Sequence, residues 1–344
     1  MAMLLLRWFL FPITIIYTSI IWLRNRLYDY QLLKSKTYNI PLIVIGNLAI
    51  GGTGKSPMTE FLIRLLKDKI KLATLSRGYG RKTKGFRFVS TQSTSAEAGD
   101  EPLQFKRKFP EITIAVCEDR CYGVEQLKDQ HDLIILDDAF QHRKLKPTYS
   151  ILLFEYTSLS GQAILLPTGN FRDMMMESHR ANIIIVTKTP EDATEEDKNK
   201  IIRKISRHNS TASIYFSKIK YDKWMDKNGS GCYTNLKETD VLLITGIANP
   251  NPLINHLQPN VNRLIHMSYP DHHAFSETDI SKIEEMYKAI TGSNKLILTT
   301  EKDFQRLYGT RLHRFPFYYI PIQIAFDTSD YQNIERSISD HLGL

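Results

Sequence analysis

The sequence predicts an α/β protein with a larger, mostly parallel sheet followed by a second, smaller α/β unit. The chain has 344 residues, more than the size at which a single hydrophobic core usually stops growing. From residue 41 onward, short continuous apolar runs alternate with helical stretches, a pattern typical of parallel strands covered by helices on both faces. Hydrophobic residues make up 42% of the chain and charged residues 24%, which excludes wholesale disorder and a collagen-like fibre.

The chain begins with a strongly apolar segment. Residues 8–23 carry no charge, contain Pro12, and are followed by Arg24 and Arg26. A helix of that length reaches roughly 24 Å, short of the ~30 Å hydrocarbon layer, so spanning a bilayer is marginal. A secretory signal is disfavoured because no small-x-small cleavage site follows. We expect residues 1–36 to form a membrane-associated helix, with a plain core helix as the alternative, and the basic residues after the run favour a cytoplasmic location for the rest of the chain.

The larger unit is expected to follow directly. Its buried strands are expected at 42–46, 71–75, 112–116, 132–138, 150–155 and 182–187, with a clear helix over 59–69. A charged stretch comes next and is most simply a solvated helix. The second series of strands is expected at 241–250, 263–269, 295–300 and 317–326. Residues 37–210 would form the larger core, 211–236 an extended connector, and 237–344 the smaller α/β domain.

Charge and cysteine content limit the possible partners. The net charge of +8 favours an anionic partner without choosing among a nucleotide, a nucleic acid and a membrane surface. No helix-turn-helix or aromatic-interleaved basic motif supports a nucleic-acid partner. The three cysteines, Cys117, Cys121 and Cys232, match no zinc or redox spacing, so we expect buried thiols in a reducing compartment.

A glycine-rich loop follows the first buried strand. Residues 49–56 read AIGGTGKS and lead into a helix, so strand, loop, lysine, serine and helix occur in the order of a Walker A phosphate loop, with Ala49 in place of the usual first glycine. Backbone N–H groups of such a loop converge on phosphate oxygens, the lysine reaches the β- and γ-phosphates, and the serine can bind Mg²⁺. The candidate nucleotide-binding residues here are Gly51, Gly52, Thr53, Gly54, Lys55 and Ser56.

A pair of carboxylates ends a later apolar strand. Asp137 and Asp138 follow LIIL at the sheet edge where open α/β sheets bind their ligands. This pattern indicates a Walker B segment, in which one carboxylate holds Mg²⁺ for phosphoryl transfer. The sequence therefore predicts a P-loop NTPase-like core that uses ATP and Mg²⁺.

Four further polar segments follow strands or turns. They supply Arg77 and Tyr79, Asp100 and Glu101, Gln141 and His142, and Asp271, His272 and His273. Two adjacent histidines do not suit one metal ion, but a His/carboxylate pair beside the transferring phosphate could take a hydroxyl proton.

The ordered set of motifs resembles the tetraacyldisaccharide 4'-kinase family. It comprises GNLAIGGTGKSP, LSRGYGR, GDEP, LDDAFQHRKL, LLPTGNFRD, TGIANP, PDHHAF and TTEKDF, between about residues 4 and 327. The resemblance implies two α/β/α units joined by a β connector, in a membrane-associated kinase that acts in lipid A assembly. Such a kinase moves the γ-phosphate of ATP to the 4'-hydroxyl of tetraacyldisaccharide 1-phosphate at the cytoplasmic face of the bacterial inner membrane.

The resemblance also implies residue roles. Lys55 and Ser56 would serve the phosphates and Mg²⁺, and Asp137 and Asp138 would complete the metal shell. Asp100 would be the general base, supported by His272, with His273 as the alternative. The remaining roles fall to side chains around the reaction centre, namely Glu101, Gln141 and His142, and near the nucleotide or acceptor, namely Arg77 and Tyr79, with Arg172 and Asp173 as further acceptor contacts.

Two other functions remain open from the residues alone. A GTPase would need an N-K-x-D segment after a later strand, where this chain has TKTP at 187–190 without the Asn or the Asp. A membrane-bound regulatory ATPase would hydrolyse ATP without an acceptor. No obligate protein partner is expected.

Overall fold

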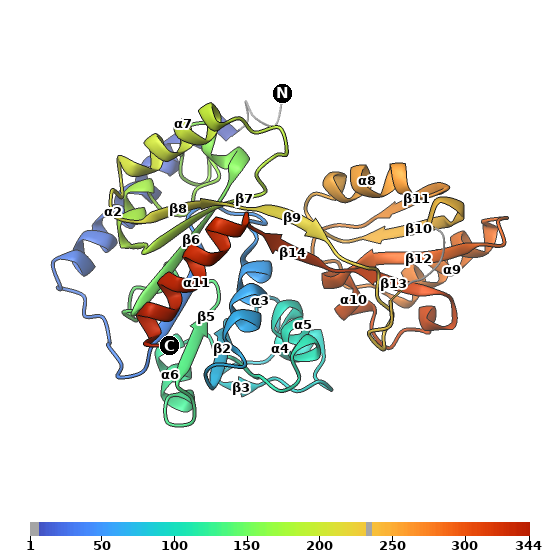
Figure 1. Ribbon diagram of the computed structural model, residues 1–344, viewed down its shortest axis with the longest axis horizontal. Coiled ribbons are helices and arrows are strands. Elements are labelled where there is room, and N and C mark those ends of the chain that lie inside the picture. Colours follow the sequence, from blue (N-terminus) through green and yellow to red (C-terminus); the bar gives the residue numbers. More distant parts are fainter. Residues whose placement is uncertain (1–6, 232–235) are drawn as a thin grey trace.

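The computed structural model describes residues 7–231 and 236–344, which form a larger and a smaller α/β unit (Figure 1). The larger unit is built on an eight-stranded sheet with the order β3-β4-β2-β5-β1-β6-β7-β8. All of its pairings are parallel except the one between β3 and β4. The strands are β1 Leu42–Asn47, β2 Leu72–Ser76, β3 Arg87–Phe88, β4 Thr113–Val116, β5 Leu133–Leu136, β6 Tyr149–Glu155, β7 Ile183–Thr187 and β8 Ser213–Phe216.

Helices cover both faces of this sheet. One face packs against α6 (Arg120–Leu127) and α7 (Glu195–Ser206), and the other against α3 (Lys55–Leu66), α5 (Asp100–Lys108) and the C-terminal helix α11 (Thr328–Leu342). Strands β1, β2, β5 and β7 are buried along their whole length, which explains why their apolar runs do not alternate with polar residues. The helical segments of this unit are α3 Lys55–Leu66, α4 Ser95–Ala98, α5 Asp100–Lys108, α6 Arg120–Leu127, η1 Tyr156–Leu159, η2 Met175–Arg180 and α7 Glu195–Ser206.

The smaller unit has a four-stranded parallel sheet with the order β11-β10-β12-β13 and a separate core on each face. Its strands are β10 Asp240–Thr245, β11 Arg263–Ser268, β12 Lys295–Thr300 and β13 Phe317–Ile320. Its helical segments are η3 Leu236–Glu238, α8 Asn251–Leu257, η4 Gln258–Asn260, α9 Glu277–Ala289, α10 Glu301–Leu307 and η5 Arg311–Arg314. The mostly parallel α/β architecture with a second, smaller sheet is confirmed.

Two strands link the units. The apolar run 317–326 was expected to be one strand, but it divides at Pro321 into β13 and β14 (Ile322–Ala325), because proline cannot donate a ladder hydrogen bond. Strand β14 pairs antiparallel with β9 (Lys218–Tyr221) between the two larger sheets (Figure 1). Strand β8, expected within the connector, is the edge strand of the larger sheet.

The chain ends against the larger unit. Helix α11 (Thr328–Leu342) crosses that sheet (Figure 1), and its Ile334 and Ile338 lie fully buried in the core around α3. The domain limits drawn from the sequence stay predictions, and the position of α11 shows that chain order alone does not separate the two units.

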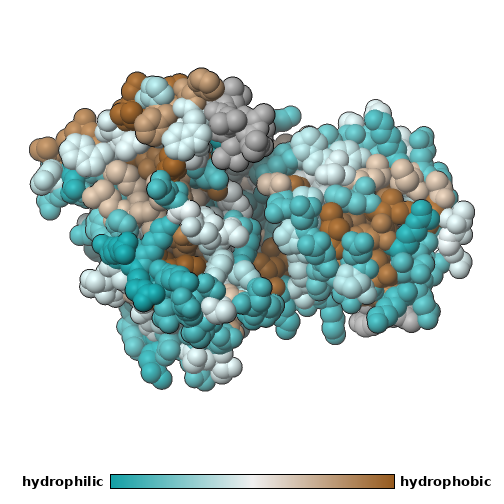
Figure 2. Space-filling view, turned by 90° about the horizontal axis from the view of Figure 1, so that it is seen from above, coloured by the Kyte–Doolittle hydropathy of each residue, from teal (hydrophilic) through white to brown (hydrophobic). Residues whose placement is uncertain are grey.

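The N-terminal helix α2 (Phe11–Asp29) docks through polar contacts. Thr14 Oγ1 donates to Thr168 Oγ1 at 2.7 Å, and Asn25 Nδ2 donates to Asp173 Oδ1 at 2.9 Å. Most of its large apolar side chains are exposed, and Figure 2 shows apolar residues gathered along this edge of the larger unit. Within residues 7–231 and 236–344, no helix is both long enough and apolar enough to cross a bilayer.

The thiols of the described part of the chain are buried as expected. Cys117 and Cys121 are free and lie in the core of the larger unit. Cys232 lies outside the described residues.

Candidate active site

The glycine-rich loop is shaped by Asn47, the last residue of β1. The Asn47 side-chain amide donates to the Ala49 carbonyl at 2.6 Å and to Thr53 Oγ1 at 2.8 Å. Gly54 has φ 84° and precedes α3, a conformation that favours glycine. Lys55 and Ser56 open α3, so unpaired N–H groups and the positive end of the helix dipole lie at the loop, as an anion site requires.

Asp138 lies beside the loop, at the end of the segment that follows β5. Its Oδ1 is 3.9 Å from Lys55 Nζ, and it forms an ion pair with Arg172, which also donates to Asn47. Burial opposes ionisation of Asp138, but Lys55 and Arg172 outweigh it and lower the pKa of this carboxyl. Asp138 is therefore an ionised carboxylate that is already neutralised by two cations.

Asp137 has a different environment. Its side chain is 3% exposed, and Thr59 Oγ1 donates to its Oδ1 at 3.1 Å. Burial, together with the nearby charges of Glu101 and Asp138, raises the pKa of Asp137 to about 7. A buried carboxyl with too little positive charge around it favours an added cation.

The segments RGYG and GDEP meet backbone to backbone. A Cβ on Gly99 would lie 2.8 Å from the Tyr79 carbonyl oxygen, and a Cβ on Gly78 would lie 2.8 Å from the Ala98 carbonyl oxygen. Both glycines also have positive φ. Only glycine allows this contact, which brings the Tyr79 loop against the start of α5, where Asp100 lies.

Asp100 is bound by two residues of the smaller unit. Its Oδ2 lies 3.3 Å from His272 Nδ1 and 2.9 Å from Arg306 Nε. Lys302 Nζ is 3.2 Å from His272 Nε2 and 3.6 Å from a Glu101 oxygen. Burial opposes ionisation of Asp100, but His272 and Arg306 lower its pKa below the ordinary value.

The choice between the two histidines follows from their contacts. His273 Nε2 lies 3.0 Å from Asp279 Oδ2, within the smaller unit. His272 faces Asp100, and its ring centroid is 5.2 Å from that of Tyr79. The structure therefore pairs Asp100 with His272.

The other predicted site residues differ in burial and in their contacts. Gln141 Nε2 donates to the Asn47 carbonyl at 2.6 Å. Burial and Arg120 lower the pKa of His142 to about 4, so this imidazole is neutral near pH 7. Arg77 and Tyr79 are exposed. The geometry thus joins the phosphate loop, two carboxylates and a carboxylate–histidine pair at one end of the larger sheet.

Comparison with known proteins shows the family of the chain. A family model described as tetraacyldisaccharide-1-P 4'-kinase matches residues 6–342. The chain belongs to the tetraacyldisaccharide-1-P 4'-kinase family. The resemblance predicted from the motifs is confirmed.

Relatives and a solved structure match nearly the whole chain. Proteins named Tetraacyldisaccharide 4'-kinase from Flavobacterium psychrophilum and Bacteroides thetaiotaomicron are 44% and 39% identical, over 93% and 97% of this chain and 93% and 91% of theirs. A crystal structure of LpxK from Aquifex aeolicus in complex with ATP has a TM-score of 0.76 at 28% identity, covering 98% of this chain and 99% of the other.

Three described non-glycine residues with positive φ lie in the segments around the kinase site. They are Asp138 (φ 48°), Lys188 (φ 55°) and His272 (φ 58°). Such conformations cost free energy and persist where the surroundings enforce them, commonly at functional sites. Lys188 follows β7, and its Nζ lies 3.8 Å from the position of a Cβ built on Gly52.

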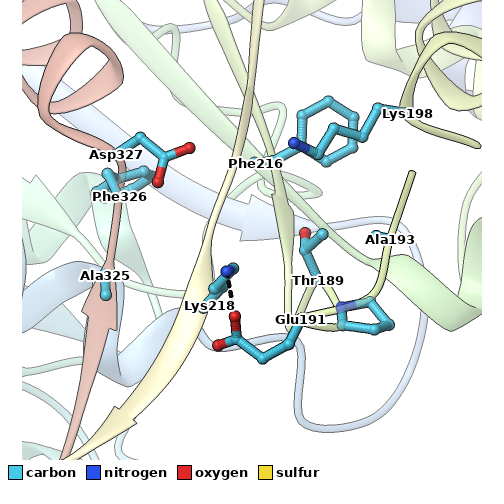
Figure 3. Close-up of a pocket in the computed structure, with 10 residues that line it drawn as sticks. Thr189, Glu191, Ala193, Lys198, Phe216, Lys218, Ala325, Phe326 and Asp327 are labelled. Atoms are coloured by element: carbon cyan, nitrogen blue, oxygen red, sulfur yellow. Dashed lines mark hydrogen bonds and ion pairs between the residues drawn. The ribbon is translucent and has the colours of Figure 1, made fainter. Parts of the chain in front are cut away.

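A hollow lies just beyond Lys188 (Figure 3). The preceding residue, Thr187, donates to the Thr53 carbonyl at 2.9 Å, which fixes this segment against the phosphate loop. The lining side chains come from the segment after β7, from α7, from β8 and β9, and from the end of β14 and the segment that follows it. They include Phe216, Phe326 and the Glu191–Lys218 ion pair. None of the residues predicted from sequence lines it.

Sequence reasoning missed several residues of the site. Asn47 lies in the motif GNLAIGGTGKSP, and Lys302 lies in TTEKDF, but sequence reasoning gave neither side chain a role. Lys302 and Arg306 are four residues apart on α10 and come directly after a strand, a spacing that puts both on one helix face. Arg172 and Asp173, expected to contact the acceptor, bind Asp138 and Asn25 respectively.

Proposed function

We propose that this protein transfers the γ-phosphate of ATP to the 4'-hydroxyl of tetraacyldisaccharide 1-phosphate, in lipid A biosynthesis. The observation that carries the proposal is the carboxylate–histidine pair Asp100–His272 beside a phosphate loop and paired carboxylates. Family membership supports the acceptor and the reaction class. The related crystal structure in complex with ATP supports ATP as the donor.

The phosphate loop would bind the triphosphate. Backbone N–H groups of residues 51–56 and the Lys55 ammonium would contact the β- and γ-phosphates. Asp138 would hold the Lys55 side chain in place, because its carboxylate forms ion pairs with Lys55 and with Arg172.

The donor groups fit a magnesium ion. Ser56 offers a hydroxyl and Asp137 a buried carboxylate, the hard oxygen ligands that Mg²⁺ prefers. Burial, together with the charges of Glu101 and Asp138, raises the pKa of Asp137, and a bound cation would oppose that shift. When bound, the ion would neutralise charge on the transferring phosphate. We assign Asp137 as the more direct carboxylate, because Asp138 is already paired with Lys55 and Arg172.

Asp100 would act as the general base. A sugar hydroxyl is a poor nucleophile near pH 7, so a carboxylate that orients it and accepts its proton assists the transfer. His272 supports the carboxylate through Oδ2. Glu101, Gln141, His142, Arg77 and Tyr79 would line the rest of the reaction centre.

We place the purine of ATP in the hollow of Figure 3. It adjoins the phosphate loop through Thr187 and Lys188, on the segment that follows a later strand, where P-loop proteins read the base. We expect Phe216→Ala to raise the KM for ATP about three- to tenfold, by loss of aromatic contact with the purine, with little change in kcat. Phe88→Ala, on the opposite edge strand, is the matched control, and equal KM values for both variants would contradict this placement.

Helix α2 would bring the kinase to its substrate. An acceptor with four acyl chains stays in the bilayer, and α2 exposes Ile16 and Ile20 by 62% and 60% of their surface. We propose that this face enters one leaflet of the inner membrane from the cytoplasmic side.

Charges on this face are expected to release the protein from lipid. The double variant Ile16→Asp, Ile20→Asp should lower the fraction that floats with phosphatidylglycerol-containing vesicles at least fivefold, because each carboxylate must leave water to enter the leaflet. ATP affinity should be unchanged. Gln126→Glu adds a negative charge at an exposed position on α6, outside α2, and serves as the control. Unchanged flotation would place the membrane contact elsewhere.

Phosphate transfer itself is tested with labelled ATP. Wild-type protein with Mg²⁺ and tetraacyldisaccharide 1-phosphate in detergent micelles should move the γ-label to the lipid, and Lys55→Met should reduce the rate about 10²–10³-fold by removing a cation from the transferring phosphate. Label released as inorganic phosphate at the same rate with and without lipid would favour a regulatory ATPase.

A further inference from the structure

We propose that Arg306 of the smaller unit is a positioning residue for Asp100: it holds the carboxylate ionised through Oδ2 and leaves Oδ1 for the acceptor hydroxyl. This inference rests on the proposed function, in which Asp100 is the base. Arg306 lies 206 positions from Asp100 in the chain.

The Arg306 guanidinium is locked in place within the smaller unit. Its side chain is 7% exposed, and Nη1 lies 3.2 Å from Asp303 Oδ1 and 3.2 Å from the His273 carbonyl oxygen. Asp303 is fully buried and is itself fixed by the Gly246 N–H at 2.9 Å and by Thr300 Oγ1 at 2.7 Å. Nε reaches the larger unit, where it donates to Asp100 Oδ2 at 2.9 Å, and Nη2 is buried without a hydrogen-bond partner.

The two oxygens of Asp100 are used unequally. Both His272 and Arg306 contact Oδ2, and among residues 7–231 and 236–344 no hydrogen bond reaches Oδ1. Asp100 also begins α5, next to Gly99. Two contacts from one side therefore orient the carboxylate and keep its second oxygen available for a hydroxyl proton.

Charge explains why an arginine occupies this position. The groups that face Asp100 or its direct partners are His272, Lys302, Asp303 and Arg306 from the smaller unit and Glu101 and Tyr79 from the larger unit. Arginine as a residue type is effectively always protonated in proteins. Arg306 thus provides a cation for Asp100 at every pH at which the enzyme would work, in a reaction that depends more on orientation than on base strength.

Other contacts between α5 and α10 have no such relation to the base. Arg107 Nη1 donates to Gln305 Oε1 at 2.9 Å, and its guanidinium carbon lies 3.8 Å from the Tyr308 ring centroid. Arg107→Gln therefore weakens the same interface without touching Asp100 and serves as the matched control.

A double-mutant cycle separates positioning from general stability. We expect Arg306→Gln to lower kcat for lipid phosphorylation about 10–100-fold in the wild-type background and less than about twofold in the Asp100→Asn background, because Arg306 acts through Asp100. Arg107→Gln should have the same small effect in both backgrounds. Arg306→Lys, which keeps the charge but not the fixed guanidinium geometry, should recover part of the loss.

The pH profile gives a second readout. Without Arg306 the acidic limb of kcat/KM should move up by about one pH unit, since an opposite charge at this distance lowers a carboxyl pKa by about that much or more. Arg107→Gln should leave the limb in place.

Loss of Arg306 also leaves Asp303 as an unpaired buried charge, so unfolding must be monitored. If Arg306→Gln does not fold, the double variant Arg306→Gln, Asp303→Asn removes both charges and carries the same expectations. Equal losses in both Asp100 backgrounds, with an unmoved acidic limb, would overturn the inference while the kinase function stands. Wild-type protein that transfers no phosphate to lipid would overturn both.

Discussion

Replacing Asp100 with asparagine is expected to lower kcat for lipid phosphorylation about 10²–10⁴-fold, the range of a lost general base. Asparagine has nearly the same shape and can still accept from Arg306 and His272, so the interface should persist. What it lacks is the ability to take the proton of the acceptor hydroxyl. The measurement is single-turnover transfer of labelled phosphate at saturating ATP and lipid.

Two controls sharpen this result. ATP affinity should be unchanged in Asp100→Asn, because within the described residues the hydrogen bonds of the Asp100 carboxylate go to His272 and Arg306 and none goes to the phosphate loop. Asp132→Asn changes an exposed carboxylate and should keep full activity. A kcat within threefold of wild type for Asp100→Asn would transfer the base role to another residue.

The pH dependence follows from the direction of the Asp100 pKa shift. Its pKa is lowered in the folded protein, so the carboxylate form is present at neutral pH. Activity that depends on this form is lost only as the pH falls through the lowered value, and the ion pairs of Asp100 stop stabilising the fold over the same acidic range.

Asp137→Asn is expected to have the second large effect, with opposite consequences for activity and stability. Loss of the carboxylate should reduce kcat about 10²–10³-fold and raise the Mg²⁺ concentration needed for half-maximal rate. The same change should stabilise the ligand-free protein by at least about 1 kcal/mol, or roughly 2–4 °C in Tm. The reason is that the raised pKa of Asp137 records a penalty for its buried charge at neutral pH.

Asp138→Asn provides the contrast. Its carboxylate pairs with Lys55 and Arg172, and its pKa is lowered. Removing that charge leaves two cations without their partner, so this variant should be less stable than wild type. Magnesium titrations and thermal unfolding of both variants, without ligand, test the assignment. An unaltered magnesium requirement in Asp137→Asn would contradict the role proposed for Asp137.

Local signals determined the larger sheet and the phosphate loop. The continuous apolar runs around Ile43 and Ile135 predict strands buried on both faces, and the structure places both residues at zero exposure. Gly54 has the left-handed backbone conformation that glycine favours, and Lys55, the next residue, begins helix α3. These features depend on neighbours in the chain, so residue order alone indicated them.

The tertiary structure decided what distant residues do for one another. Only docking of the two units pairs Asp100 with His272 and Arg306, across 172 and 206 positions. Packing also brings Arg172 into an ion pair with Asp138 and places α11 in the core of the larger unit. A residue pattern records which side chains are apolar or charged, whereas ion pairs and cores between separate units depend on distances that arise when the chain folds. Residue order therefore indicates the fold class, the family resemblance and the phosphate loop, whereas the partners of the proposed base follow from the docking of the two units.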